Sequence, residues 1–343
     1  MRPSSLVRSV IVLGLLAGAG ALPAAAQSYH VARTFTLGGD GGWDYIALDT
    51  AGHRLFIARQ DRIMVVSEDS GTVLGEIPGL NRAHGVAFDY ASGHGFATSG
   101  ADSAVTMFDL RTLAVLGRTT AAVDDDAVLY DPATRHVFTM NGDAGSSSVI
   151  DPVSGRRIGA IELGGKPEFG VSAGDGKLYV NIEDKNEVAE VDARAMRVVR
   201  RWSIAPCEAP SGLAIDRAHH RLFSVCRSGV MGVSDAAAGR LVTTVPIGRG
   251  VDAARFDPGT QLAFASNGDG TLTVVHEDAP DRYSVVATVP TKPGARTMEI
   301  DLGTHRIFTV SADFGPAPAP TAERPRPRPP VLPGTFALLV LEP

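Results

Sequence analysis

The stretch DPATRHVF at residues 131–138 decides the fold, because it returns as DRAHHRLF at residues 216–223 and as DLGTHRIF at residues 301–308. Each copy places an acid before a turn and an aromatic residue in the short apolar run that follows. The aromatic position recurs about every 42 residues, at Phe56, Phe96, Phe138, Tyr179, Phe223, Phe264 and Phe308. Seven copies of one structural unit are therefore predicted.

Two series of acids keep the same spacing. The acid before the turn recurs at Asp49, Asp89, Asp131, Asp216, Asp257 and Asp301, while the fourth unit has a shortened turn at residues 174–176. A second acid ends a later apolar run, at Glu68, Asp109, Asp151, Asp192, Asp235 and Glu277. Each unit reads as four short strands separated by turn residues, which is typical of a propeller blade. The sequence predicts an all-β, seven-bladed β-propeller with four-stranded blades.

Ring closure can be predicted from the two ends of the repeat array. The last unit supplies strands near residues 297–301, 306–311 and 335–341, and it lacks an outer strand. The segment at residues 29–37 is the β-like segment that precedes the first unit. We expect it to complete the last blade, because pairing the two ends protects both strand edges.

Composition and charge limit the class of protein. The chain has 343 residues, a formal net charge of −6 and 44 % hydrophobic residues, with 38 glycines and 22 prolines. This apolar content supports a full core and argues against a disordered chain. The excess of acids and the lack of a basic run argue against a nucleic-acid partner bound through its phosphates.

The N-terminus reads as a secretory signal peptide. Arg2 and Arg8 precede an apolar run at residues 10–22, and three alanines follow at residues 24–26. A basic segment, a short apolar segment and small residues at a cleavage site define such a peptide. We expect residues 1–26 to be removed after Ala26, leaving residues 27–343 as one periplasmic or secreted propeller without a membrane span; the alternative is an uncleaved anchor.

The two cysteines, Cys207 and Cys226, are predicted to form a disulfide. An oxidising compartment favours pairing, and the sequence has no CxxC motif that would indicate a redox or metal role. Closing a loop of this length stabilises the fold by about 3 kcal/mol.

The three DxxxxRxF-like turns and the sevenfold unit resemble the YVTN-type, YncE-like bacterial β-propellers, and the resemblance covers essentially the whole mature chain. This resemblance implies an extracytoplasmic binding or surface protein. Some relatives are implicated in binding single-stranded DNA, which the acidic balance of this chain does not favour.

One residue per unit is expected at the channel mouth. Counting five residues back from each inner-strand acid gives Asp44, His84, Asp126, Ser211, Asp252 and Arg296, and position adds Glu168 from the fourth unit. We interpret these seven as the ligand-binding ring. Its four carboxylates, Asp44, Asp126, Glu168 and Asp252, are candidate ligands for Ca²⁺ or Mg²⁺, because converging carboxylates repel one another without a cation. Asn141, Asn181 and Asn267 end second strands on the same face and are expected to add amide oxygens. The alternative is a solvated polar channel.

Two further features bear on the site. Residues 315–334 contain eight prolines with Arg324, Arg326 and Arg328, and they are expected to rise from the same face as a lid, a docking strand or a spacer. The histidines that recur after the turn acids are interpreted as structural and placed on the opposite face, at His53, His94, His136, His220 and His305.

These features favour a monomeric binding or interaction scaffold over an enzyme, with a small molecule or an extracytoplasmic protein as partner. The alternative is a metal-dependent hydrolase or lactonase, in which Glu168, Asn181, Asn267 and Asp252 hold the ion and His84 acts as general base. A quinoprotein-type redox subunit is less favoured, since the sequence contains no haem motif.

Overall fold

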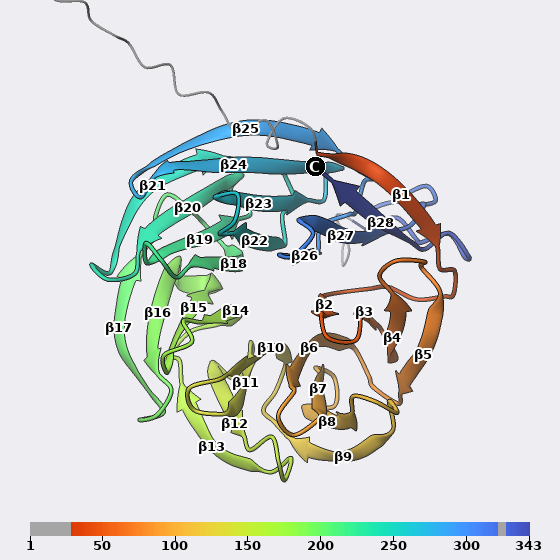
Figure 1. Ribbon diagram of the computed structural model, residues 1–343, viewed down its shortest axis with the longest axis horizontal. Coiled ribbons are helices and arrows are strands. Elements are labelled where there is room, and N and C mark those ends of the chain that lie inside the picture. The colour runs from red at the N-terminus through yellow and green to blue at the C-terminus, as the bar shows by residue number, and fades with distance from the viewer. Residues whose placement is uncertain (1–28, 322–326) are drawn as a thin grey trace, which may run out of the picture.

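The computed structural model describes residues 29–321 and 327–343. In this part of the chain, seven four-stranded antiparallel sheets form a ring around a common centre (Figure 1). The seven-bladed β-propeller predicted from the repeats is confirmed. The predicted signal peptide, residues 1–26, lies outside the described residues. Among the residues that are described, no helix is both long and apolar enough to cross a membrane.

The strands follow one another from the centre outward in each of the first six blades. Blade 1 contains β2 (Ile46–Asp49), β3 (Arg54–Arg59), β4 (Arg62–Ser67) and β5 (Val73–Pro78). Blade 2 contains β6 (Ala83–Asp89), β7 (His94–Ser99), β8 (Ala104–Asp109) and β9 (Val115–Thr120). Blade 3 contains β10 (Asp125–Asp131), β11 (His136–Asn141), β12 (Ser146–Ile150) and β13 (Arg157–Glu162).

The next three blades repeat this order. Blade 4 contains β14 (Pro167–Ser172), β15 (Lys177–Ile182), β16 (Glu187–Asp192) and β17 (Arg197–Ser203), with a 3₁₀ turn at Glu183–Lys185. Blade 5 contains β18 (Pro210–Asp216), β19 (Arg221–Cys226), β20 (Val230–Asp235) and β21 (Arg240–Pro246). Blade 6 contains β22 (Ala253–Asp257), β23 (Leu262–Asn267), β24 (Thr271–Ala279) and β25 (Arg282–Pro290).

Blade 7 is built from both ends of the chain. It contains β26 (Met298–Asp301), β27 (Arg306–Ser311) and β28 (Ala337–Glu342), and β1 (His30–Thr36) is its outer strand. β1 pairs antiparallel with β28, from His30 opposite Glu342 to Thr36 opposite Ala337. The predicted closure is confirmed, and β1 covers the edge that β28 would otherwise expose.

The repeated aromatic residues hold neighbouring blades together. All seven lie in the second strand of a blade and are at most 4 % exposed. Phe56 of blade 1 packs 5.0 Å from Phe88 of blade 2, and Phe223 of blade 5 stacks 5.1 Å from Phe256 of blade 6. Burying one phenylalanine contributes about 1.5–3 kcal/mol, so the need for an apolar contact between blades explains the repeat.

The predicted disulfide between Cys207 and Cys226 is present, with the two Cα atoms 5.4 Å apart. Cys207 lies in the segment that enters blade 5, and Cys226 ends the second strand of that blade. The bond therefore fixes this entry segment against the sheet it leads into.

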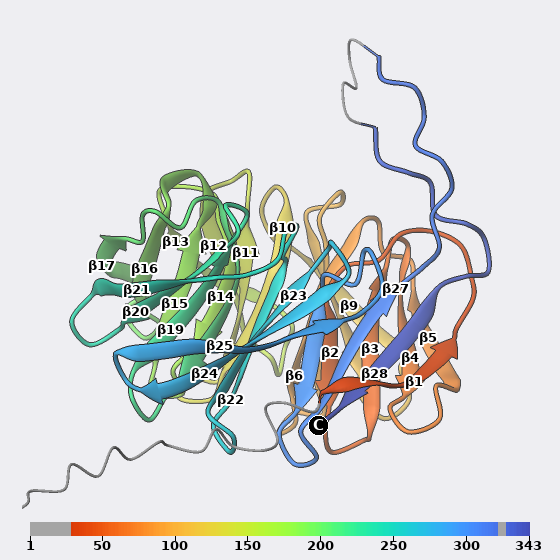
Figure 2. The ribbon, with the colours of Figure 1, turned by 90° about the horizontal axis from the view of Figure 1, so that it is seen from above.

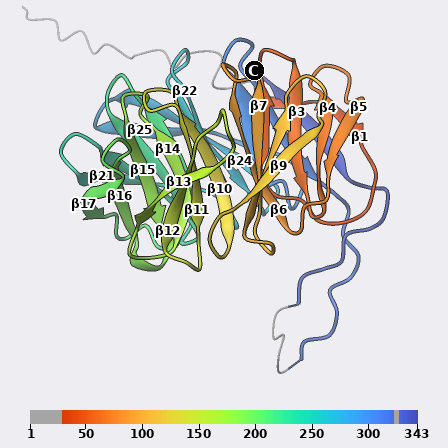
Figure 3. The ribbon, with the colours of Figure 1, turned by 90° about the horizontal axis from the view of Figure 1, so that it is seen from below.

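The proline-rich segment leaves the ring between β27 and β28. Its described residues, 315–321 and 327–334, stand away from one face of the propeller; we call them the arm (Figures 2 and 3). Phe314 and Val331 pair at its base, where Leu332 N donates to Asp313 O at 2.8 Å. The arm therefore projects outward rather than lying across the channel. Arg324 and Arg326 lie outside the described residues.

Candidate binding site at the channel mouth

β-bulges place four of the seven predicted mouth residues. In blades 2 to 5, the pairing between the first two strands shifts register close to the start of the inner strand. The shifted segments contain His84, Asp126, Glu168 and Ser211. A bulge re-aims a side chain that a regular strand would direct into the sheet face. Asp44, Asp252 and Arg296 come just before the inner strands of blades 1, 6 and 7.

Five of the seven residues line one cavity of about 990 Å³: Asp44, Asp126, Glu168, Asp252 and Arg296. Arg328, Pro329 and Val331 from the arm also line it. The acidic residues and the arm thus share one face, as their positions in the repeat predicted. The other two contact residues that line the cavity: His84 contacts Asp44 and Asp126, and Ser211 contacts Asp252.

His84 is held between two carboxylates and an arginine. Its Nδ1 lies 2.5 Å from Asp44 Oδ2 and 3.2 Å from Asp126 Oδ1. Arg82 donates from Nε to His84 Nε2 at 2.9 Å and also pairs with Asp124. This network assigns the hydrogen to Nδ1, which donates to Asp44. Burial opposes charge on the ring, but the hydrogen bond that His84 donates to Asp44 and the charge of Asp126 outweigh it and raise the pKa of His84.

Asp252 has the best-paired carboxylate of the four. Arg296 Nε donates to its Oδ2 at 2.7 Å, and Ser211 Oγ lies 3.1 Å from its Oδ1. Burial nevertheless raises the pKa of Asp252, against the opposing effect of Arg296. The pair joins blades 6 and 7 across the mouth.

For Glu168 and Asp126, no arginine of residues 29–321 and 327–343 is aligned in this way. Arg227 lies 3.6 Å from Glu168 but only 2.7 Å from Glu183, so its charge is directed mainly to the latter. Burial, together with the charges of Glu183 and Asp252, raises the pKa of Glu168 to about 7. Burial raises the pKa of Asp126 well above its usual range, although His84 opposes this effect. Burial therefore disfavours the charged form of both carboxyl groups, and a cation beside them would offset that cost.

The sequence reading missed Tyr45, which lies among these carboxylates. Burial, followed by the charges of Asp126 and Asp252, raises the pKa of its hydroxyl far above the ordinary value. Its ring packs 5.3 Å from that of Phe169. Both rings line a second cavity of about 370 Å³ at the other side of the centre. Tyr45 therefore separates the mouth from the rest of the channel.

Other lining residues were also missed. Trp43 and Phe314 form an aromatic wall, with ring centroids 6.0 Å apart, and Trp43 Nε1 is buried without a hydrogen-bond partner. Arg227 stands where the second strand of a blade has just ended, a position that holds glycine in blades 2, 3 and 6. Aligning the repeats at that position would have revealed the charge.

The asparagines that were expected to add oxygen ligands make hydrogen bonds within and between the blades instead. Asn181 Nδ2 donates to the carbonyls of Ser211 and Gly212, at 2.8 and 3.1 Å, and Asn141 Nδ2 donates to Ser146 and Ser148 at 3.2 Å. Asn267 donates to two threonines of its own blade. None of the three lines the mouth cavity.

Comparisons with known proteins support the fold class alone. The sequence matches no family model and no curated protein. The structure is similar to one titled Kuenenia stuttgartiensis hydrazine synthase, with a TM-score of 0.68 and 13 % identity over 86 % of this chain and 96 % of that one. It is also similar to the structure of U3-55K, with a TM-score of 0.75 and 10 % identity over 91 % and 99 % of the two chains. The fold shared with both is that of a β-propeller.

Proposed function

We propose that this chain is an exported binding propeller, of the YVTN-type and YncE-like kind, that takes up a small organic cation at the channel mouth. The observation that carries this proposal is the burial of carboxylates that no arginine neutralises closely. The cavity wall holds five carboxylates, from Asp44, Asp126, Glu168, Asp252 and Asp269, and four arginines, Arg227, Arg249, Arg296 and Arg328. Among the described residues, Asp252 is the one of the four ring carboxylates that accepts a hydrogen bond from an arginine. A buried carboxylate without a partner costs several kcal/mol, which a bound cation offsets.

The aromatic wall favours an organic cation over a metal ion. Trp43, Tyr45 and Phe314 line the same cavity as the carboxylates, and the faces of aromatic rings attract ammonium groups. Arg227, Arg249 and Arg328 lie at the rim, where they suit an anionic group elsewhere on the ligand. A ligand with an amine at one end fits this arrangement.

The proposal of export rests on the sequence pattern of residues 1–26, and the disulfide is in keeping with it. A secreted or periplasmic propeller with an open, charged mouth suits capture of a ligand from solution. The arm, which stands beside that mouth, offers a surface for a protein partner (Figure 2).

The alternative of a metal-dependent hydrolase rests on Asp44, His84 and Asp126, whose ligand atoms lie within 4.8 Å of one another. His84 fits a metal poorly, because Nδ1 donates to Asp44 while Nε2 accepts from Arg82. A Ca²⁺ or Mg²⁺ ion would have to bind without the imidazole and without the three asparagines.

The test is calorimetric titration of the mature protein with putrescine and choline, with 1,4-butanediol and succinate as uncharged and anionic controls. We expect a cation to bind and Glu168→Gln or Asp126→Asn to weaken binding at least tenfold. Glu76→Gln, on the outer strand β5, is the matched control and should bind as the wild type does. Binding of succinate alone, or unchanged binding in both mouth variants, would contradict the proposal. Ester hydrolysis that requires Ca²⁺ would favour the hydrolase.

A further inference from the structure

A second cluster of metal-ligand residues lies on the opposite face, between blades 5 and 6. Asp216 ends β18, His219 lies in the turn that follows, and Glu277 belongs to β24 of the next blade. His219 Nδ1 is 2.7 Å from Asp216 Oδ2 and 3.2 Å from Glu277 Oε1. The sequence pattern predicted a structural histidine at His220 and assigned no role to the adjacent His219.

The polar atoms of this cluster converge without satisfying one another. Asp216 and Glu277 are each 2 % exposed. Within the part of the chain that the structure describes, neither carboxylate oxygen of Glu277 has a hydrogen-bond partner, and His219 Nδ1 is not aligned to donate to either acid. Burial and the adjacent charge of Asp216 raise the pKa of the Glu277 carboxyl. An unpartnered, buried carboxylate aimed at an imidazole is a costly arrangement unless a cation is shared.

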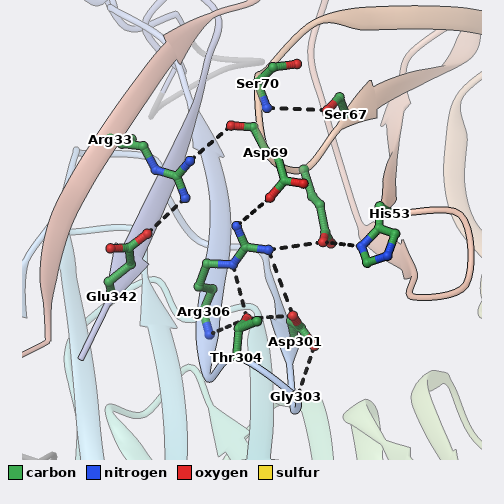
Figure 4. Close-up of polar contacts among 11 residues, drawn as sticks. Arg33, His53, Ser67, Asp69, Ser70, Asp301, Gly303, Thr304, Arg306 and Glu342 are labelled. Carbon is green, nitrogen blue, oxygen red and sulfur yellow. Dashed lines mark hydrogen bonds and ion pairs between the residues drawn. The ribbon is translucent and has the colours of Figure 1, made fainter.

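The matching junction between blades 7 and 1 shows how the fold can pair the same acid with an arginine, although Oε2 of Glu68 has no hydrogen-bond partner among the described residues (Figure 4). Here Glu68 is the buried acid, and Arg306 Nη2 lies 3.0 Å from its Oε1. Arg306 also pairs with Asp69 at 2.8 Å, and His53 Nδ1 lies 2.9 Å from Glu68 Oε1. An arginine from one blade thus neutralises the acid of the next.

Blades 5 and 6 have an arginine at the same place, but it is engaged elsewhere. Arg221 faces Asp216 in the strand register just as Arg306 faces Asp301. Its Nε donates to Pro280 O at 2.6 Å, and its Nη2 donates to Asp281 at 2.9 Å. Both acceptors belong to the turn of the long hairpin formed by β24 and β25, each of nine residues. The long hairpin therefore draws the guanidinium away from Glu277.

We propose that Asp216, His219 and Glu277 form a binding site for a divalent transition-metal ion, with Zn²⁺ as the best fit. One imidazole and two carboxylates are ligands that Zn²⁺ accepts, usually with bonds of about 2.0–2.2 Å. Tetrahedral bonds of that length separate the ligand atoms by roughly 3.3 Å, close to the 3.2 Å between His219 Nδ1 and Glu277 Oε1. The 2.7 Å between His219 Nδ1 and Asp216 Oδ2 is shorter, so the half-exposed imidazole must move away from Asp216 when an ion binds.

The fourth position of the site opens to solvent. The side chain of His219 is 38 % exposed, whereas those of Asp216 and Glu277 are at most 3 % exposed. An ion can therefore enter past the imidazole, and water can occupy the position that the protein leaves open. The bound ion would join blade 5 to blade 6, taking the place that Arg306 has at the other junction.

The test uses untagged mature protein, stripped with chelator, dialysed, and titrated with Zn²⁺ by calorimetry and with Co²⁺ by visible absorption. We expect one equivalent to bind, and His219→Ala and Glu277→Gln each to weaken it at least tenfold. His219 lies in a half-exposed turn, so His219→Ala keeps the test valid if Glu277→Gln folds poorly. A raised melting temperature with metal should be lost in both variants.

Two controls separate this site from other sources of binding. Glu68→Gln removes the equivalent acid of the blade 7–blade 1 junction, and Asp126→Asn removes a mouth carboxylate; both should bind Zn²⁺ as the wild type does. Absence of Zn²⁺ binding in the wild type would overturn the proposal. Binding by His219→Ala and Glu277→Gln as tight as that of the wild type would show an adventitious ion only and would also overturn it. Loss of binding in Asp126→Asn would place the ion at the mouth, which also overturns it.

Discussion

The junction between blades 7 and 1 and the junction between blades 5 and 6 use the same repeat positions with opposite electrostatic outcomes. At the first, Arg306 lies 3.0 Å from the buried Glu68. At the second, the equivalent Arg221 bonds to Asp281, and Glu277 faces Asp216 and His219 instead. The difference shows that a repeated acid is structural where an arginine of the preceding blade pairs with it, and is available for a ligand where that arginine bonds elsewhere.

Arg306→Met should produce the largest effect on stability, because it leaves Glu68 buried without its cation. Removing one partner of a buried ion pair destabilises a protein by about 3–5 kcal/mol. The free energy of unfolding, measured with urea, should fall by about that amount. Arg306→Met combined with Glu68→Gln should recover most of the loss, since no buried charge then remains. An unchanged unfolding midpoint in Arg306→Met would show that this arginine does not neutralise the junction.

The channel mouth extends the comparison, because Glu168 is another buried acid whose cation is poorly placed. Its pKa of about 7 lies above the ordinary 4.5, so between these values the folded chain holds a proton that the unfolded chain has lost. The free energy of unfolding should therefore fall as pH rises through this window, by on the order of 3 kcal/mol. Glu168→Gln should flatten the dependence when urea unfolding is measured from pH 4.5 to pH 7.5. An identical pH profile for the variant and the wild type would contradict this prediction.

The two equivalent acids should respond in opposite directions to neutralisation. Glu68→Gln loses a charged hydrogen bond to Arg306 and should destabilise the protein by about 2 kcal/mol. Glu277→Gln removes one of two facing carboxylates and should stabilise the metal-free protein at pH 8. Thermal unfolding in the presence of EDTA measures both. Changes of the same sign in the two variants would remove the distinction between the junctions.

His53 offers the smallest and most direct probe of the first junction. The hydrogen bond to Glu68, reinforced by the charge of that residue, raises the pKa of the exposed imidazole. Titration followed by NMR should therefore give a pKa above the ordinary 6.5, and Glu68→Gln should lower it. The same pKa for His53 in both proteins would show that the pair does not form in solution.

The sequence was sufficient to predict the fold because the burial of one aromatic side chain is a local requirement that every blade repeats. Each blade must bury one aromatic side chain against its neighbour, so Phe56 and its six equivalents recur in phase with the blades. The closing strand and the disulfide followed from the chain ends and the cysteine count. The faces also followed, since an inner strand has the same direction in every blade.

The places of the candidate site's residues were predictable from the repeat, but only some of their hydrogen-bond partners were. Counting back from the turn acids found Asp44, Asp126, Asp252 and Arg296, and position in the fourth unit added Glu168; all five line one cavity. It missed Tyr45 at the centre and assigned ligand roles to Asn181 and Asn267, whose amides are used within and between the sheets. Counting along the repeat predicts where a side chain lies, but it does not predict which hydrogen bonds that side chain makes.

The sequence by itself determined seven blades, their closure by β1 and the face on which the acids and the arm meet. The tertiary structure alone decided which acids are neutralised, because that depends on contacts of a few ångströms between side chains from different blades. Arg306 and Arg221 are alike in the sequence repeat, yet a longer hairpin in blade 6 draws the second arginine away. That displacement leaves Asp216, His219 and Glu277 as the set of residues open to a metal ion.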